Sequence, residues 1–147
     1  MSSVLPCKPE ILDCTLRDGG YVIDFAFTED EVKHIVADLS EAGVPYIEIG
    51  HGLGLGAYRR VGSGGVLSDK ETVKAALKAK RDSSLGMFFI GGIGEADDIR
   101  MACDMGLDFI RIGTNVSNYE SAFKYIEIAK NAGLKVFLNF MKSYTVS

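Results

Sequence analysis

The chain has 147 residues, of which 47% are hydrophobic and 24% charged, the composition of an ordinary soluble globular domain. Its 16 basic and 20 acidic residues give a formal net charge of −4, and no basic run could follow a phosphate backbone. We therefore expect neither nucleic acid nor anionic membrane as a partner. There is no apolar stretch of roughly 18 residues, no signal-peptide core, and no CxxC spacing among Cys7, Cys14 and Cys103, which together predict a cytoplasmic protein without a disulfide scaffold.

Short apolar segments alternate with amphipathic ones along the whole chain, and this alternation predicts five strands and four helices. The strands are expected at residues 10–16, 46–50, 85–90, 109–112 and 135–140, and the helices at 28–42, 68–81, 95–105 and 117–132. Strands that alternate with helices are typically parallel and joined by right-handed crossovers. The predicted class is therefore α/β.

The ends of the predicted helices carry capping chemistry. Three starts have the Ser/Thr-x-x-Glu form of a capping box, at Thr28–Glu31, Ser68–Glu71 and Ser117–Glu120. In such a box a hydroxyl and a carboxylate satisfy free backbone N–H groups reciprocally. Three exits carry a glycine before the next apolar strand, at Gly43, Gly106 and Gly133. Glycine readily adopts the left-handed conformation that ends a helix.

Two arrangements of parallel strands fit this pattern. Length favours an open, flavodoxin-like sheet, because a complete (β/α)₈ barrel takes about 250 residues. A barrel is favoured by the absence of a Gly-rich phosphate loop after the first strand. It is also favoured by polar residues at successive strand ends, namely Asp18, His51, Asn115 and Lys142, where a barrel places its active site.

The first predicted strand runs into unusual polar residues. Strand alternation would send Asp13, Thr15 and Arg17 to one face and Cys14 to the face that packs on the helices. Charged groups inside a strand are costly unless they line a polar cavity. The alternative is an ordinary turn with an Arg17–Asp18 ion pair at the surface.

Three segments resemble the DRE-TIM metallolyases, which include 4-hydroxy-2-oxovalerate aldolases, HMG-CoA lyases, and isopropylmalate and homocitrate synthases. Residues 12–19, LDCTLRDG, resemble the first-strand signature of this superfamily. Residues 41–56, EAGVPYIEIGHGLGLG, look like the IE-x-x-HG-x-GLG segment of the aldolases, and residues 108–120, DFIRIGTNVSNYE, are similar to their fourth-strand segment. The resemblance covers essentially the whole chain and decides for the barrel. It implies that residues 1–147 are the N-terminal part of a (β/α)₈ catalytic domain.

The resemblance also implies a chemistry. Asp18 would be a ligand of Mn²⁺ or Mg²⁺, both of which suit a hard carboxylate. Arg17 would bind the oxygens of a 2-oxo acid substrate and stabilise its enolate. The activity implied is cleavage of a 4-hydroxy-2-oxo acid to a pyruvate-type enolate and an aldehyde. A Claisen-type acyltransferase of the isopropylmalate synthase kind is the alternative enzyme.

The sequence departs from the family pattern at three points. Tyr21 stands where the aldolases place a histidine base, and a phenol, with an ordinary pKa near 10, is a poor base at neutral pH. Tyr21 remains a candidate catalytic residue, because a tyrosine bound to the metal or paired with an arginine could still shuttle protons. Asn115 also replaces a histidine. The family's late His-x-His metal pair has no counterpart, because the chain has only His34 and His51. We therefore expect the chain alone to be inactive.

Further site residues follow from strand alternation and position. Glu48, between two isoleucines, should face the barrel interior and either orient Arg17 at the substrate or form a plain buried ion pair. His51 should line the barrel mouth as a catalytic residue, and Asn139 should contact substrate. Lys142 suggests a Schiff-base aldolase, which the metal-type signature disfavours.

The remaining expectations concern a helix, a loop and the open edges. His34 should lie on a helix surface, and Arg111 should face the interior. Residues 50–65 should form a mobile active-site loop that brings Arg59 and Arg60 to an anionic substrate. Five strands of eight leave two unpaired edges. Either the rest of a longer chain or a second copy should cover them, and a non-catalytic half-barrel that self-associates is the rival interpretation.

Overall fold

The computed structural model describes residues 9–61 and 65–146, so Cys7 and part of the predicted loop lie outside it. Five parallel strands form one sheet: β1 (Leu12–Asp13), β2 (Tyr46–Ile49), β3 (Ser84–Ile90), β4 (Phe109–Asn115) and β5 (Lys135–Met141). Five α-helices accompany them: α1 (Glu29–Glu41), α2 (Tyr58–Val61), α3 (Asp69–Ala79), α4 (Ala96–Asp104) and α5 (Phe123–Asn131). Three 3₁₀ segments complete the elements: η1 (Gly19–Ile23), η2 (Val116–Ala122) and η3 (Ser143–Thr145).

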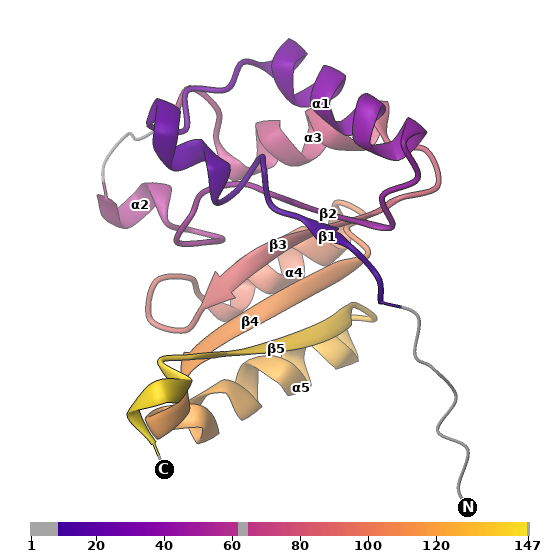
Figure 1. Cartoon of the computed structure of the whole chain (residues 1–147). Helices are drawn as coiled ribbons and strands as arrows, with labels where there is room; N and C mark the ends of the chain where they lie inside the picture. The colour runs from indigo at the N-terminus through magenta and orange to yellow at the C-terminus, as the bar shows by residue number, and fades with distance from the viewer. Residues whose placement is uncertain (1–8, 62–64, 147) are drawn as a thin grey trace, which may run out of the picture.

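The strand order decides between the two arrangements that the sequence allowed. Each strand pairs with the next one along the chain, in the order β1-β2-β3-β4-β5, and every pair is parallel. A doubly wound sheet reverses its strand order at a switch point, and this sheet does not. The structure is therefore a curled half-barrel, as the barrel interpretation predicted (Figure 1).

The hydrophobic core lies between one face of this sheet and the helices. Strand residues such as Ile47, Ile49 and Phe89 are fully buried there and belong to the same cluster as Val36 of α1 and Ile99 of α4. Burying each such side chain stabilises the fold by about 1.5–3 kcal/mol. In Figure 1, α1 and α3 lie together over the β2 end of the sheet and α5 runs along β5. The opposite face, here called the interior face, carries Glu48, Phe88 and Arg111, which alternate with the core residues.

Two of the three predicted capping boxes are confirmed. Thr28 caps α1 with Glu31, and Ser68 caps α3 with Glu71. The box predicted at Ser117 is wrong, because residues 116–122 form the 3₁₀ segment η2 and α5 begins only at Phe123. Asn118 has non-helical dihedrals there, and its carbonyl accepts bonds from the hydroxyls of Thr114 and Ser121. The predicted exit glycines are confirmed, with φ of 77°, 95° and 95° at Gly43, Gly106 and Gly133.

The first strand is much shorter than predicted. Only Leu12 and Asp13 pair with β2. The carboxylate of Asp13 then accepts bonds from the backbone and hydroxyl of Thr15, and the carbonyl of Cys14 accepts from the N–H groups of residues 17, 18 and 19. These local bonds replace the ladder with a turn. Alternation therefore fails here, and Cys14 lies on the interior side, 3.4 Å from Glu48, not on the helix-packing side.

Two apolar side chains are exposed at the β5 edge, and three aromatic rings pack together on the interior face. Leu138 and Phe140 of β5 are 37% and 48% exposed. Rings of Tyr46, Phe109 and Phe137 pack edge to face at the start of the strands, with centroids 5.4–5.7 Å apart. Within the part of the chain that the structure describes, no helix is long and apolar enough to cross a membrane.

Candidate active site

The interior face holds a carboxylate between two arginines. Glu48 of β2 is fully buried, and its Oε2 accepts a 2.6 Å bond from Nε of Arg17. Arg111 of β4 reaches the same carboxylate from the other side, with Nε 2.8 Å from Oε1 and Nη2 2.6 Å from Oε2. The side chains of Arg17 and Arg111 are only 11% and 18% exposed. Since an unpaired buried charge is expensive, each guanidinium depends on Glu48.

An aromatic ring supports both guanidiniums. The Cζ atoms of Arg17 and Arg111 lie 5.0 and 4.7 Å from the ring centroid of Phe88 on β3, within cation–π range. That ring has room because Gly113 of β4 lies beside it, and a Cβ at Gly113 would come 2.3 Å from Cζ of Phe88. Strands β2, β3 and β4 and the turn after β1 therefore meet in one network.

The network also fixes the charge of its members. The hydrogen bonds that Arg111 donates to Glu48 hold the pKa of Arg111 above its usual value. Burial raises the pKa of the Cys14 thiol, so the thiol stays protonated at neutral pH. Cys14 is thus a neutral neighbour of the ion pairs and not a nucleophile.

Asp18 lies at the outer edge of this network. Its Oδ1 is 3.1 Å from Nη1 of Arg17, which also donates to the carbonyl of Gly52 at 3.3 Å, and the Asp18 side chain is 62% exposed. The described residues contain no group of three or more His, Cys, Asp or Glu side chains that could hold a metal ion. A divalent cation requires several oxygen or nitrogen ligands, and the exposed carboxylate of Asp18 could supply one of them.

Tyr21 and His51 meet at the end of β2 around a third ring. Phe25 stacks on the imidazole of His51, with centroids 3.9 Å apart, and Tyr21 packs edge-on against Phe25 at 4.8 Å. Tyr21 also covers Gly52, where a Cβ would lie 2.2 Å from its ring. The Tyr21 side chain is 52% exposed. The two predicted residues are therefore neighbours, joined by Phe25.

The predicted mobile loop is anchored on its helix side. The N–H of Gly56 donates to the carboxylate of Asp69 at the start of α3, at 2.8 Å. Arg59 of α2 forms a bidentate pair with Asp98 of α4, so its guanidinium is engaged there and not available to an interior substrate. Arg60 is exposed. Burial raises the pKa of Asp69 to about 6, against the lowering effect of the Gly56 bond.

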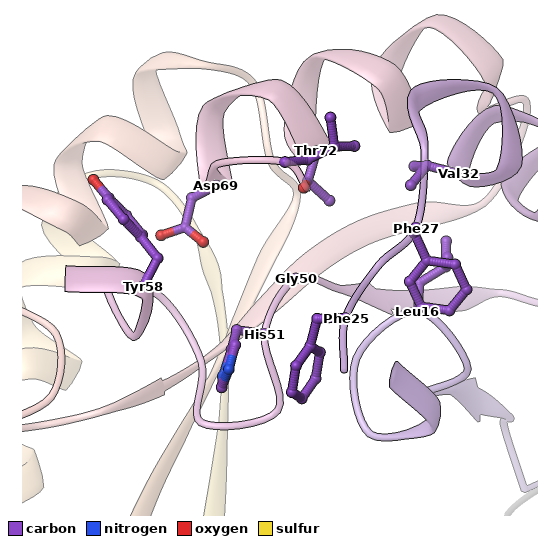
Figure 2. A pocket seen from close by; sticks show the side chains of 10 residues that line it. Leu16, Phe25, Phe27, Val32, Gly50, His51, Tyr58, Asp69 and Thr72 are labelled. Carbon is purple, nitrogen blue, oxygen red and sulfur yellow. The ribbon is translucent and has the colours of Figure 1, made fainter. Parts of the chain in front are cut away.

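A small cavity of about 30 Å³ lies behind this loop. Figure 2 shows Gly50 at its centre, with Asp69 and Thr72 on one side and His51 beside Phe25 on the other. A space of this size holds about one water molecule and not a substrate. This cavity is therefore too small to be a substrate pocket.

The other predicted site residues lie apart from the network. Asn139 of β5 pairs in register with Gly113, and the structure gives its side chain no hydrogen bond to the described residues. Asn115 lines a separate polar cavity of about 120 Å³ at the ends of β3, β4 and β5. Lys142 is exposed, with a φ of 56°. His34 lies on the surface of α1, as predicted.

Some contacts of the site residues could not be predicted from the sequence. Arg111 was placed on the interior face but not paired with Glu48, although both alternate with isoleucines on nearby strands. Phe25 could not be assigned, because its φ of 57° and its approach to His51 depend on the turn after β1. The capping box of Glu95 with Asp98 was also missed, since it has Glu in place of Ser or Thr.

Comparison with known proteins places the chain in a family. Residues 8–143 match the family model described as HMGL-like. The chain is 37% identical over 137 residues to an oxaloacetate decarboxylase of Mycobacterium tuberculosis, which covers 93% of this chain and 40% of that protein. It is 34% identical over 139 residues to a 4-hydroxy-2-oxovalerate aldolase of Carboxydothermus hydrogenoformans, covering 95% of this chain and 41% of that enzyme. The chain thus spans about 40% of the length of these curated relatives.

A solved structure supports the same conclusion for the fold. The N-terminal domain of a Bacteroides vulgatus protein assigned as an aldolase superposes with a TM-score of 0.72 at 23% identity, over 93% of this chain and 46% of that one. The strand order and the family match agree with one another. The chain belongs to the HMGL-like family and matches its N-terminal half.

Proposed function

We propose that the chain supplies half of the active site of a divalent-metal-dependent lyase that breaks a C–C bond next to a 2-oxo acid and releases a pyruvate-type enolate. One observation carries the proposal. Glu48 and the ring of Phe88 hold the guanidinium of Arg17 in place beside the exposed carboxylate of Asp18, at the end of a barrel strand. In barrels of this kind the carboxyl ends of the strands carry the chemistry.

The residues take different parts in this chemistry. Arg17 binds the oxygens of the 2-oxo acid, and its fixed positive charge stabilises the enolate as negative charge develops. Glu48 acts through Arg17 and not by direct contact, because arginines occupy both of its oxygens. Asp18 is one ligand of Mn²⁺ or Mg²⁺, which supplies Lewis-acid polarisation of the keto group when bound. Asn139 and Tyr21 stay candidates for the substrate pocket.

Two substrate classes fit this chemistry, and they differ in whether cleavage of the C–C bond needs a base. Aldol cleavage of a 4-hydroxy-2-oxo acid needs a base to remove the hydroxyl proton, whereas decarboxylation of a 2-oxo diacid releases CO₂ and leaves the same enolate without that base. Tyr21 stands where the aldolases have their histidine. The aldolase is our first candidate. Tyr21 favours a 2-oxo diacid decarboxylase as the second, and the relative from Mycobacterium tuberculosis carries the name oxaloacetate decarboxylase.

The edges of the sheet support a proposal about the partner. Among the described residues, β1 and β5 each have one unpaired side, and Leu138 and Phe140 of β5 are exposed. We infer that further strands close the barrel, either from the rest of a longer chain or from another copy, and that the complete protein works in the cytoplasm. Light scattering during size-exclusion chromatography separates these cases, because a well-behaved monomer of the chain alone would exclude self-association.

The test reconstitutes a complete barrel. The chain is co-expressed with a polypeptide that carries the remaining strands of the Carboxydothermus hydrogenoformans aldolase, and pyruvate release is followed with lactate dehydrogenase and NADH. We expect Mn²⁺-dependent pyruvate release from a 4-hydroxy-2-oxo acid, or from oxaloacetate above the release that Mn²⁺ alone causes, and no such release after Asp18→Asn or from the chain alone. Retained activity in Asp18→Asn would refute the ligand assignment, and turnover that requires acetyl-CoA would indicate the acyltransferase instead.

A further inference from the structure

The imidazole of His51 is held in one protonation form by the loop after β2. Its Nδ1 lies 3.0 Å from the backbone nitrogen of Leu53. A backbone N–H can only donate, so Nδ1 must be the acceptor and carries no proton. In a neutral imidazole the single proton then lies on Nε2.

The stack described above keeps this ring from turning. Phe25 lies nearly parallel to it, with an interplanar angle of 28°. Phe25 and its neighbour Asp24 both have left-handed backbone dihedrals, with φ of 57° and 50°, a conformation that residues other than glycine rarely adopt. Gly20 leaves the space for the ring, because a Cβ there would come 2.5 Å from Phe25. Strained backbone of this kind persists where the surrounding structure holds it, often at functional sites.

The other ring nitrogen is free and reaches solvent. The structure gives Nε2 no hydrogen-bond partner in residues 9–61 and 65–146, and over the same residues the only buried side-chain nitrogen or oxygen without a partner is Oγ of Ser40. Nε2 is therefore not enclosed. Burial lowers the pKa of His51, which favours the neutral ring at pH 7. The neighbouring Gly52 carbonyl accepts from Arg17, so the loop that holds His51 adjoins the proposed enolate site.

We propose that His51 is a hydrogen-bond donor, and not a base, and that its neutral Nε2–H binds an oxygen of the 2-oxo acid or enolate that Arg17 holds. This rests on the proposed function. A neutral imidazole can polarise a carbonyl through its N–H group. Taking up a proton at Nδ1 would require loss of the Leu53 bond, which makes His51 unsuited to general-base chemistry.

The first test identifies the tautomer of His51 directly by NMR. The chain with His34→Gln has a single imidazole, and long-range ¹H–¹⁵N correlation spectra of histidine-labelled protein distinguish the two tautomers. We expect the Nε2–H form at neutral pH, and mixed tautomers in the variant that also carries Phe25→Ala. A predominant Nδ1–H form or an imidazolium at neutral pH would overturn the inference.

The second test measures whether Nε2–H of His51 donates a hydrogen bond to a bound ligand. Oxalate, a planar dianion shaped like the pyruvate enolate, is titrated with Mg²⁺ into the same labelled chain. We expect the Nε2–H signal to shift, and His51→Phe to weaken oxalate binding about 5-fold, the effect of losing one neutral hydrogen bond, with partial rescue by His51→Gln. An unshifted Nε2–H signal would overturn the inference, and turnover by the reconstituted barrel would then leave the proposed function standing.

Discussion

Replacing Glu48 by glutamine tests the network that holds Arg17. The substitution keeps the shape of the side chain but removes the charge that three guanidinium bonds share. Breaking a buried ion pair from one side costs about 3–5 kcal/mol. Arg17 and Arg111 keep slight exposure, and glutamine retains one acceptor, so we expect the lower end, about 3 kcal/mol of unfolding free energy.

Urea denaturation followed by far-UV circular dichroism measures this loss. The matched control is Glu41→Gln, because Glu41 pairs with Arg81 at 3.5 Å while both side chains are more than 60% exposed. We expect the control to change the unfolding free energy by less than about 0.5 kcal/mol. A loss in Glu48→Gln within about 1 kcal/mol of the control would show that the network is not desolvated, and would refute the reasoning that it fixes Arg17.

Three further predictions concern the loop anchor, a cap and the ring platform. Asp69 has a pKa of about 6 in the folded protein against an ordinary 3.8, so between these pH values the folded state binds more protons than the unfolded state. The free energy of unfolding therefore falls by about 3 kcal/mol as the pH rises through this range. Asp69→Asn should therefore melt higher than the parent near pH 7.5 and equally near pH 3.5, and a lower melting temperature near pH 7.5 would contradict this. Ser68→Ala should cost about 1 kcal/mol in urea denaturation. Ser117→Ala, at the position where the predicted box failed, should cost nothing measurable, and equal losses would contradict the cap assignment. Gly113→Ala should lower the free energy of unfolding by about 1–3 kcal/mol, because the added Cβ displaces the ring of Phe88. Gly19→Ala should not lower it, because a Cβ there meets nothing closer than 3.9 Å. Equal melting temperatures of the two variants would show that Gly113 is not needed to make room for Phe88.

Most of the fold could be predicted because hydrophobic periodicity and helix ends are local signals. Strands β2 to β5 and helices α1, α3 and α4 lie within a few residues of their predicted ranges. The predictions failed where side chains compete for backbone bonds. Asp13 ends β1 early by binding Thr15, and Thr114 and Ser121 bind the carbonyl of Asn118 where a regular helix was expected.

The candidate site was predictable in part for the same reason. Alternation placed Glu48 and Arg111 on the interior face, and the first-strand signature singled out Arg17 and Asp18. The pairing of one carboxylate with two arginines depends on strand register, which the sequence does not give. The stack of Phe25 on His51 depends on left-handed residues after β1, for which no local sequence rule exists.

The most direct test of the central claim is to locate the metal on the chain itself. Mn²⁺ is titrated into ¹⁵N-labelled protein, and the broadening of each amide signal is mapped. We expect weak binding, since Asp18 is a single ligand, with broadening centred on Asp18 and its neighbours Arg17 and Gly19 and lost in Asp18→Asn. Broadening that centres elsewhere, or that persists unchanged in Asp18→Asn, would contradict the assignment of this edge of the half-barrel as a metal and enolate site.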